Sequence, residues 1–228
     1  MRICLLCQQN SIESNLLDWL FDFTGHEKYL CQKCQQQFIP INPQTACPGC
    51  GRKQAVKKIC QDCQSWAKNS SQQLLNNRAL FCYNLQMKKY FEKYKFQGDY
   101  QLRLIFQKKF QQVIKQIGNK KIIIPIPVSP TTWQQRGFNQ VEGFLAGTDY
   151  LDVLIVKPDF FKDSQSHKKR YQRLALPQPF TLKSQINLQQ KDCLLIDDVY
   201  TTGRTLYHAS KVLQAAGVSS IKSLTLAR

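Results

Sequence analysis

Acidic residues are few in this sequence, and long apolar runs are missing. Only 15 aspartates and glutamates stand against 32 lysines and arginines, which gives a formal net charge of +17. No stretch has the length of about 20 apolar residues that a membrane-spanning helix needs. Residues 1–10 lack the basic and then apolar layout of a signal peptide. We therefore expect a cytoplasmic protein with no membrane insertion.

The positive charge is concentrated in the larger part of the chain. Residues 1–64 carry seven basic and five acidic side chains, a net charge of +2, whereas residues 66–228 carry 25 and 10, a net charge of +15. A basic surface attracts polyanions, and nucleic acid is the most common polyanion in cytoplasm. The alternative is a soluble basic protein without such a partner.

Cysteines are unevenly placed. Eight of the ten form four Cys-x-x-Cys pairs near the N-terminus: Cys4 and Cys7, Cys31 and Cys34, Cys47 and Cys50, Cys60 and Cys63. Two such pairs complete a tetrahedral metal site, and a reducing compartment favours metal over disulfides. We predict two structural zinc ions. Sequential pairing gives a double zinc ribbon, but a crossed pairing (first with third, second with fourth) stays open at this point.

We predict two domains, a cysteine-rich module over residues 1–65 and an α/β domain over residues 66–228. A core as small as that of the first module needs a staple such as zinc. In the second domain, apolar runs predict strands at 79–83, 122–126, 151–156, 193–196 and 220–226. Helical spacing and glycine stops predict helices at 85–96, 100–117, 139–146 and 203–216, with a long loop at 157–179. This alternation favours a mostly parallel sheet with flanking helices.

The most informative segment covers residues 194–205. An apolar strand ends in Asp197 and Asp198, and a loop rich in threonine leads into a helix. Such a loop aims backbone N–H groups and a helix N-terminus at one point, which suits a phosphate. The segment closely resembles the phosphoribosyl pyrophosphate motif of type I phosphoribosyltransferases. The resemblance implies that the two acids contact ribose hydroxyls and that the loop wraps the 5′-phosphate with Thr201, Thr202, Gly203, Arg204 and Thr205.

The whole chain resembles the ComF family of late competence proteins, in its ComFC type. The resemblance includes the four cysteine pairs and the phosphoribosyl motif. It also includes Lys-Phe-Gln-Gly-Asp at 95–99, Pro-Ile-Pro at 125–127, Arg-Gly-Phe-Asn-Gln at 136–140, and Ser-Gln at 164–165 with Arg173 and Phe180 downstream. It implies a type I phosphoribosyltransferase-like fold and a role in natural transformation. The expected partners are single-stranded DNA and a helicase-like, DNA-translocating ATPase.

This chain has no G-x-x-x-x-G-K-[ST] loop, so it should not be the motor itself. The alternative function is an active phosphoribosyltransferase that uses phosphoribosyl pyrophosphate and Mg²⁺ on a nucleobase; whether such catalysis survives stays open. Arg136 is a candidate for phosphate contact or for a structural role at a helix start. Further candidates for pyrophosphate or DNA phosphate lie in the long loop: Lys168, Lys169, Arg170 and Arg173. Of the aromatic residues that could stack on bases (Tyr83, Phe91, Tyr94, Phe96 and Trp133), we expect only Trp133 to be exposed.

Overall fold

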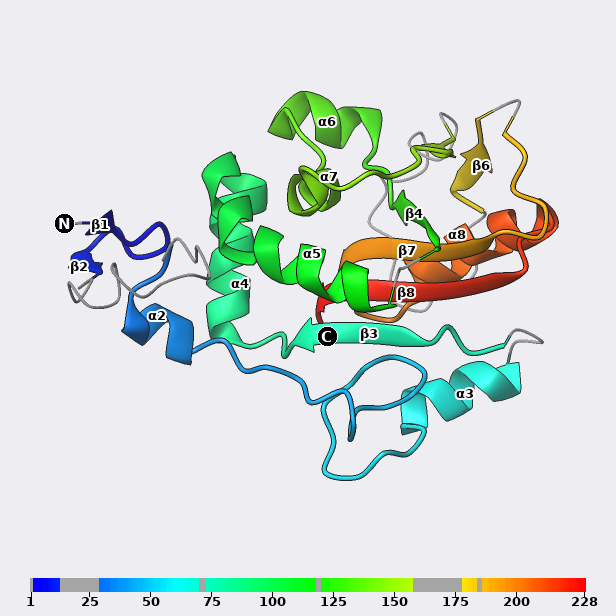
Figure 1. Ribbon diagram of the computed structural model, residues 1–228, viewed down its shortest axis with the longest axis horizontal. Coiled ribbons are helices and arrows are strands. Elements are labelled where there is room, and N and C mark those ends of the chain that lie inside the picture. The colour runs from blue at the N-terminus through cyan, green and yellow to red at the C-terminus, as the bar shows by residue number, and fades with distance from the viewer. Residues whose placement is uncertain (1, 13–28, 70–72, 118–119, 158–177, 184–185) are drawn as a thin grey trace, which may run out of the picture.

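A four-stranded parallel sheet in the order β3–β8–β7–β4 is the centre of the protein in the computed structural model (Figure 1). The strands are β3 (Asn77–Phe81), β8 (Ser220–Ala227), β7 (Asp192–Val199) and β4 (Ile122–Pro125). The structure describes residues 2–12, 29–69, 73–117, 120–157, 178–183 and 186–228. Each neighbouring pair of strands is parallel, so their carboxyl ends meet at one edge. The predicted parallel α/β architecture is confirmed.

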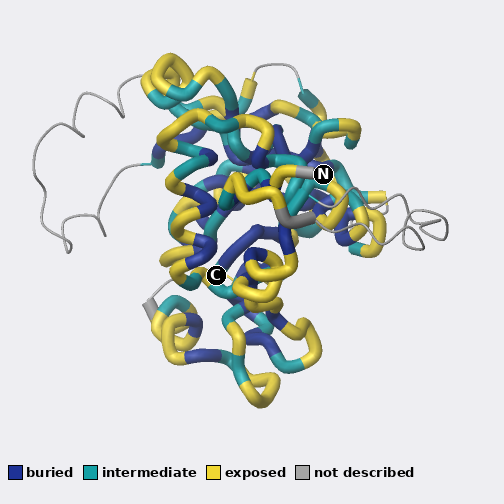
Figure 2. The backbone as a smooth tube through the Cα atoms, turned by 90° about the vertical axis from the view of Figure 1, so that its left-hand side faces the viewer, coloured by how far each residue is buried: buried dark blue, intermediate teal, exposed yellow. Residues whose placement is uncertain are grey.

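Side chains of the sheet alternate between two hydrophobic cores. Leu194 and Ile196 of β7 pack in one core with α4 (Leu85–Phe91), α5 (Leu104–Ile117) and α7 (Gln140–Leu145). Cys193 and Leu195 point into the other core, which contains α8 (Arg204–Ala215). A parallel strand covered on both faces reads as a continuous apolar run. The sheet is therefore the buried middle layer, and in Figure 2 the dark blue, buried segments lie toward the middle of the molecule while the yellow, exposed ones lie toward its outside.

The predicted helix over residues 85–96 consists of two parts. Asn84 caps α4 by accepting a hydrogen bond from the Met87 N–H. The α-helix then continues as a π-helical turn, η1 (Glu92–Phe96). The predicted helix at 100–117 likewise begins with a 3₁₀ turn, η2 (Tyr100–Arg103), before α5. Single π turns are frequent at functional sites, so η1 is a candidate part of the functional site.

Helix α6 (Pro130–Arg136) is not among the predicted helices. Ser129 caps it through a hydrogen bond from the Thr132 N–H, and Pro130 takes the first helical position. Gly137 ends it with φ of +79°. The helix buries none of its residues, so the sequence has no apolar period there.

The predicted strand at 151–156 lies outside the parallel sheet. Strand β5 (Leu154–Val156) pairs antiparallel with β6 (Phe180–Leu182) in a separate two-stranded sheet. Strand β6 itself was not predicted, because it is only three residues long and falls at the end of the expected loop. Most of that loop, with Lys168, Lys169, Arg170 and Arg173, lies outside the described residues.

The N-terminal part adds short elements: β1 (Arg2–Ile3), β2 (Asn10–Ile12), α2 (Gln32–Gln36) and α3 (Gln61–Asn69). Cys4, Cys31 and Cys34 pack in the same core as α4 and α5. The cysteines of the third and fourth pairs, at 47, 50, 60 and 63, pack in the core that contains α8. The domain boundary at residue 65 stays a prediction. Among the described helices, none is both long and apolar enough to cross a membrane.

Candidate functional site

The paired cysteines gather in two groups of four. The first cysteine group is Cys4, Cys7, Cys31 and Cys34, and the second cysteine group is Cys47, Cys50, Cys60 and Cys63. Within each group, all sulfur atoms lie within 4.8 Å of one another. The pairs are therefore joined sequentially along the chain, and the crossed pairing is excluded.

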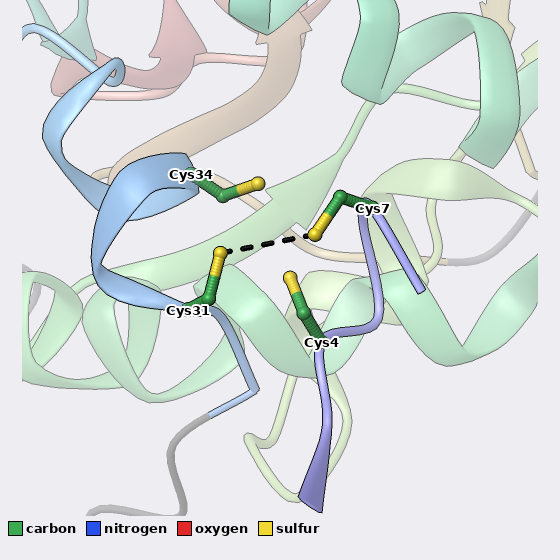
Figure 3. Close-up of side chains that lie close together, drawn as sticks. All are labelled: Cys4, Cys7, Cys31 and Cys34. Atoms are coloured by element: carbon green, nitrogen blue, oxygen red, sulfur yellow. Dashed lines mark hydrogen bonds between the residues drawn. The ribbon is translucent and has the colours of Figure 1, made fainter. Parts of the chain in front are cut away.

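The spacing of the sulfur atoms fits a tetrahedral metal ion. Bonds of about 2.3 Å to one ion place ligand sulfurs about 3.8 Å apart. The Sγ atoms of Cys7 and Cys31 are 3.8 Å apart, as are those of Cys47 and Cys63. In Figure 3 the four side chains of the first group point toward one another. Each group could hold one metal ion with all four positions filled by sulfur.

The acid pair, Asp197 and Asp198, lies at the carboxyl end of β7. Both residues are buried, with 7% and 6% of their surface exposed. The carboxyl group of Asp197 accepts a 2.8 Å hydrogen bond from the Asp198 N–H through Oδ1. Burial, followed by the negative charge of Asp198, raises the pKa of Asp197 to about 8. Asp197 is therefore mainly protonated at neutral pH.

Lys95 of η1 supplies the counter-charge. Its ammonium group forms an ion pair with the Asp198 carboxylate, and both side chains are largely buried. The same ammonium lies 4.4 Å from the centre of the Phe91 ring. Lys95 is not among the predicted site residues. Its place in the run at 95–99, which is part of the family resemblance, could have indicated a role in the site. Only the fold, however, brings that run to the end of β7.

Arg136 also contacts η1. Its Nε donates a 3.0 Å hydrogen bond to the Lys95 carbonyl, and its guanidinium also donates to the Gln140 side chain. Burial lowers the pKa of Arg136, while the charge of Asp198 acts in the opposite direction. The structure thus places Arg136 beside the acid pair, where it joins η1 to the start of α7.

The Thr-rich loop, residues 201–205, is open to solvent above the buried acids. Thr201, Thr202 and Thr205 are exposed, and Arg204 is half-buried. Gly203 has φ of +79°, and a Cβ added there would lie 2.2 Å from the Tyr200 hydroxyl. Glycine is therefore required both by the backbone conformation and by the close approach of Tyr200. The loop leads directly into α8, so backbone N–H groups at the helix start face this edge.

Several aromatic side chains lie on segments that follow or contact the carboxyl ends of the strands. Trp133 is 49% exposed, as expected, but Phe96 and Tyr83 are exposed too, at 78% and 46%. The expectation that Trp133 alone is exposed is wrong, because Phe96 ends the π turn and Tyr83 lies beyond the end of β3. Phe91 and Tyr94 belong to the core.

Comparison with known proteins identifies the family. A model of the phosphoribosyl transferase domain matches residues 140–228, which include the acid pair and the Thr-rich loop. The chain is 37% identical over 227 residues to competence protein ComFC of Streptococcus pneumoniae, covering 99% of both proteins. This chain belongs to the ComFC family. Its sequence is also 34% identical over 233 residues to ComFC of Bacillus subtilis, covering 99% of this chain and 95% of that protein.

The fold of this ComFC family member is phosphoribosyltransferase-like, as the domain match and the parallel sheet show. Among solved structures, a hypoxanthine phosphoribosyltransferase from Staphylococcus aureus is 16% identical, with a TM-score of 0.32 over 54% of this chain and 61% of that one. The predicted family and fold class are confirmed, and the family supports a role in competence.

Proposed function

We propose that this ComFC family member binds single-stranded DNA that has entered the cytoplasm during natural transformation. The observation that carries the proposal is its similarity to two competence proteins over almost the whole chain. In this proposal the carboxyl edge of the sheet is the binding site. A phosphorylated sugar lies against the acid pair, and its phosphate lies at the Thr-rich loop.

Charge supports a polyanionic ligand. The chain has a formal net charge of +17, and most of it falls after residue 65. Lys95, Arg136 and Arg204 are among the basic side chains at this edge of the sheet. The basic residues at 168–173 belong to the same proposal as contacts to phosphate, although they lie outside the described residues. Such contacts make affinity fall with salt, because binding releases counterions.

Exposed aromatic side chains support a single-stranded ligand. Tyr83 follows β3, Phe96 is next to Lys95, and Trp133 lies one turn before Arg136. All three are exposed near the carboxyl edge of the sheet. Unpaired bases stack on such rings, and each stack contributes about 1–3 kcal/mol.

The two cysteine groups complete the proposal as structural zinc sites. Sulfur ligands at all four positions leave no site for a substrate or water, so the ions would stabilise the fold rather than catalyse a reaction. A helicase-like, DNA-translocating ATPase is the proposed partner, since this chain lacks a phosphate loop of the G-x-x-x-x-G-K-[ST] kind.

Fluorescence anisotropy with a labelled single-stranded oligonucleotide tests the proposal. Four phosphate contacts would lower affinity about 50-fold between 50 and 200 mM salt. Trp133→Ala and Phe96→Ala should each weaken binding by at least about fivefold. Val56→Ala is the control. Val56 is also an exposed apolar residue, but it belongs to the segment between Cys50 and Cys60 and not to the proposed binding edge. No binding by the unmodified protein at low salt would refute the function.

An active phosphoribosyltransferase is the second candidate, because the domain match covers both the acid pair and the Thr-rich loop. This candidate requires phosphoribosyl pyrophosphate with Mg²⁺ and a nucleobase as substrates. Pyrophosphate release in a panel of nucleobases, lost on Asp197→Asn, would support it. If no nucleobase gives release while titration calorimetry detects bound phosphoribosyl pyrophosphate, the site binds a phosphoribose without catalysis.

A further inference from the structure

The second cysteine group is connected to the Thr-rich loop through helix α3. Cys63 and Trp66 lie one turn apart on this helix. The Trp66 Nε1–H donates a 2.9 Å hydrogen bond to the Thr202 carbonyl. The Trp66 ring stacks on Tyr207 in the first turn of α8, with ring centres 4.4 Å apart and planes 24° apart. One side chain beside a cysteine thus contacts both the loop and the helix that follows it.

A second connection runs through the chain end. The Arg228 guanidinium lies 3.0 Å from the carboxylate of Asp62, the residue before Cys63. The same guanidinium lies over the Tyr200 ring at 5.2 Å. Tyr200 in turn lies against Gly203 so closely that no side chain fits there. The conformation of residues 200–203 is therefore supported from the side of the second cysteine group.

The first cysteine group contacts a different part of the site. Leu6, between Cys4 and Cys7, accepts a 2.7 Å hydrogen bond from the Lys93 ammonium through its carbonyl. Lys93 belongs to η1, the turn that also carries Lys95. The core that contains Cys4 and Leu6 also contains Phe91, which precedes this turn, and Tyr94, which lies within it. The first group is thus connected to the counter-charge of Asp198.

We propose that the two cysteine groups position opposite sides of one site: the first group holds the η1 turn with Lys95, and the second holds the Thr-rich loop. Four-coordinate metal fixes the backbone around its ligands and couples binding to local folding. Loss of one ion should therefore loosen only the segment that its group contacts. Lys93 and Trp66 act as positioning residues. The inference rests on the proposed function only for the ligand of the site, because the positioning itself needs no ligand.

Hydrogen exchange of the full-length protein, followed by mass spectrometry, tests the inference without a ligand. Cys60→Ser should lose one metal ion per chain and speed exchange in peptides over residues 201–205, leaving residues 93–97 unchanged. Cys7→Ser should do the reverse. Equal acceleration of both segments by each variant, or no acceleration in either, would overturn the proposal.

Milder variants keep the test decisive if a cysteine variant does not fold. Trp66→Phe keeps an aromatic ring but removes the donor to Thr202, so loop exchange should rise about fivefold, the equivalent of one hydrogen bond. Lys93→Met should raise exchange in η1 by a similar factor. Trp133→Phe is the matched control and should leave the loop unchanged. Unchanged loop exchange in Trp66→Phe refutes the positioning. Oligonucleotide binding by the unmodified protein is measured separately, so failure of the proposed function is recognised independently.

Discussion

Replacing Asp197 with asparagine should change how the stability of the protein depends on pH. The Asp197 carboxyl is buried beside charged Asp198, and its pKa is raised to about 8 from an ordinary value of 3.8. Between these values the unfolded chain loses the proton, but the native state keeps it. The unfolded state therefore gains stability as pH rises through this range, and the native state is destabilised.

The magnitude follows from the gap in pKa. Each pH unit within it corresponds to about 1.4 kcal/mol. From about pH 5 to pH 8, the loss of native-state stability caused by Asp197 should grow by on the order of 4 kcal/mol. Asparagine does not titrate, and its side-chain oxygen can still accept the hydrogen bond from the Asp198 N–H. The stability of the variant relative to the unmodified protein should therefore rise steadily with pH.

Urea denaturation at several pH values measures the difference. Asp192→Asn is the matched control at the other end of β7, because a hydrogen bond from Ser220 and then one from Lys121 lower the pKa of Asp192. The stability that Asp192 provides is lost only on acidification below its ordinary pKa, so this variant should show no trend from pH 5 to 8. A flat difference for Asp197→Asn would mean that Asp197 is ionised in the native state, which would refute the buried, protonated acid.

Three further predictions concern the ion pair, the metal groups and the core. Lys95→Met should lower the free energy of unfolding by about 3 kcal/mol, because Asp198 is left as a buried, unpaired charge. The double variant with Asp198→Asn should recover most of this loss. If it recovers none, the pairing of Lys95 with Asp198 is contradicted. Elemental analysis should find two metal ions per chain, and their removal by a chelator should lower the melting temperature; a single ion would refute one of the groups. Phe110→Ala should cost about 3–5 kcal/mol in denaturant unfolding, because the ring is buried and stacks on Phe144 at 4.9 Å. The exposed Ile155→Ala should change it by less than about 0.5 kcal/mol, and equal losses would contradict the position of the core.

Patterns between neighbouring residues predicted much of the fold. Residues 193–196 of β7 form a continuous apolar run because both faces of the sheet are covered, and the positions of β7 and β8 agree with the predicted strands within a few residues. The amphipathic spacing in α5 likewise comes from packing along one side of the helix. The exposed helix α6 was missed because it buries nothing, and β6 was missed because it is too short for a periodic signal.

By itself, the sequence determined the family, the fold class and the set of eight paired cysteines that could hold metal, because these depend on local spacing and on residue identity. Only the tertiary structure decided how the cysteines pair, that Lys95 neutralises Asp198, and that Trp66 contacts a loop 136 residues away. The physical reason is that such contacts depend on strand order and on which face of the sheet each helix covers. Residues that are far apart in sequence leave no periodic pattern when the fold brings them together.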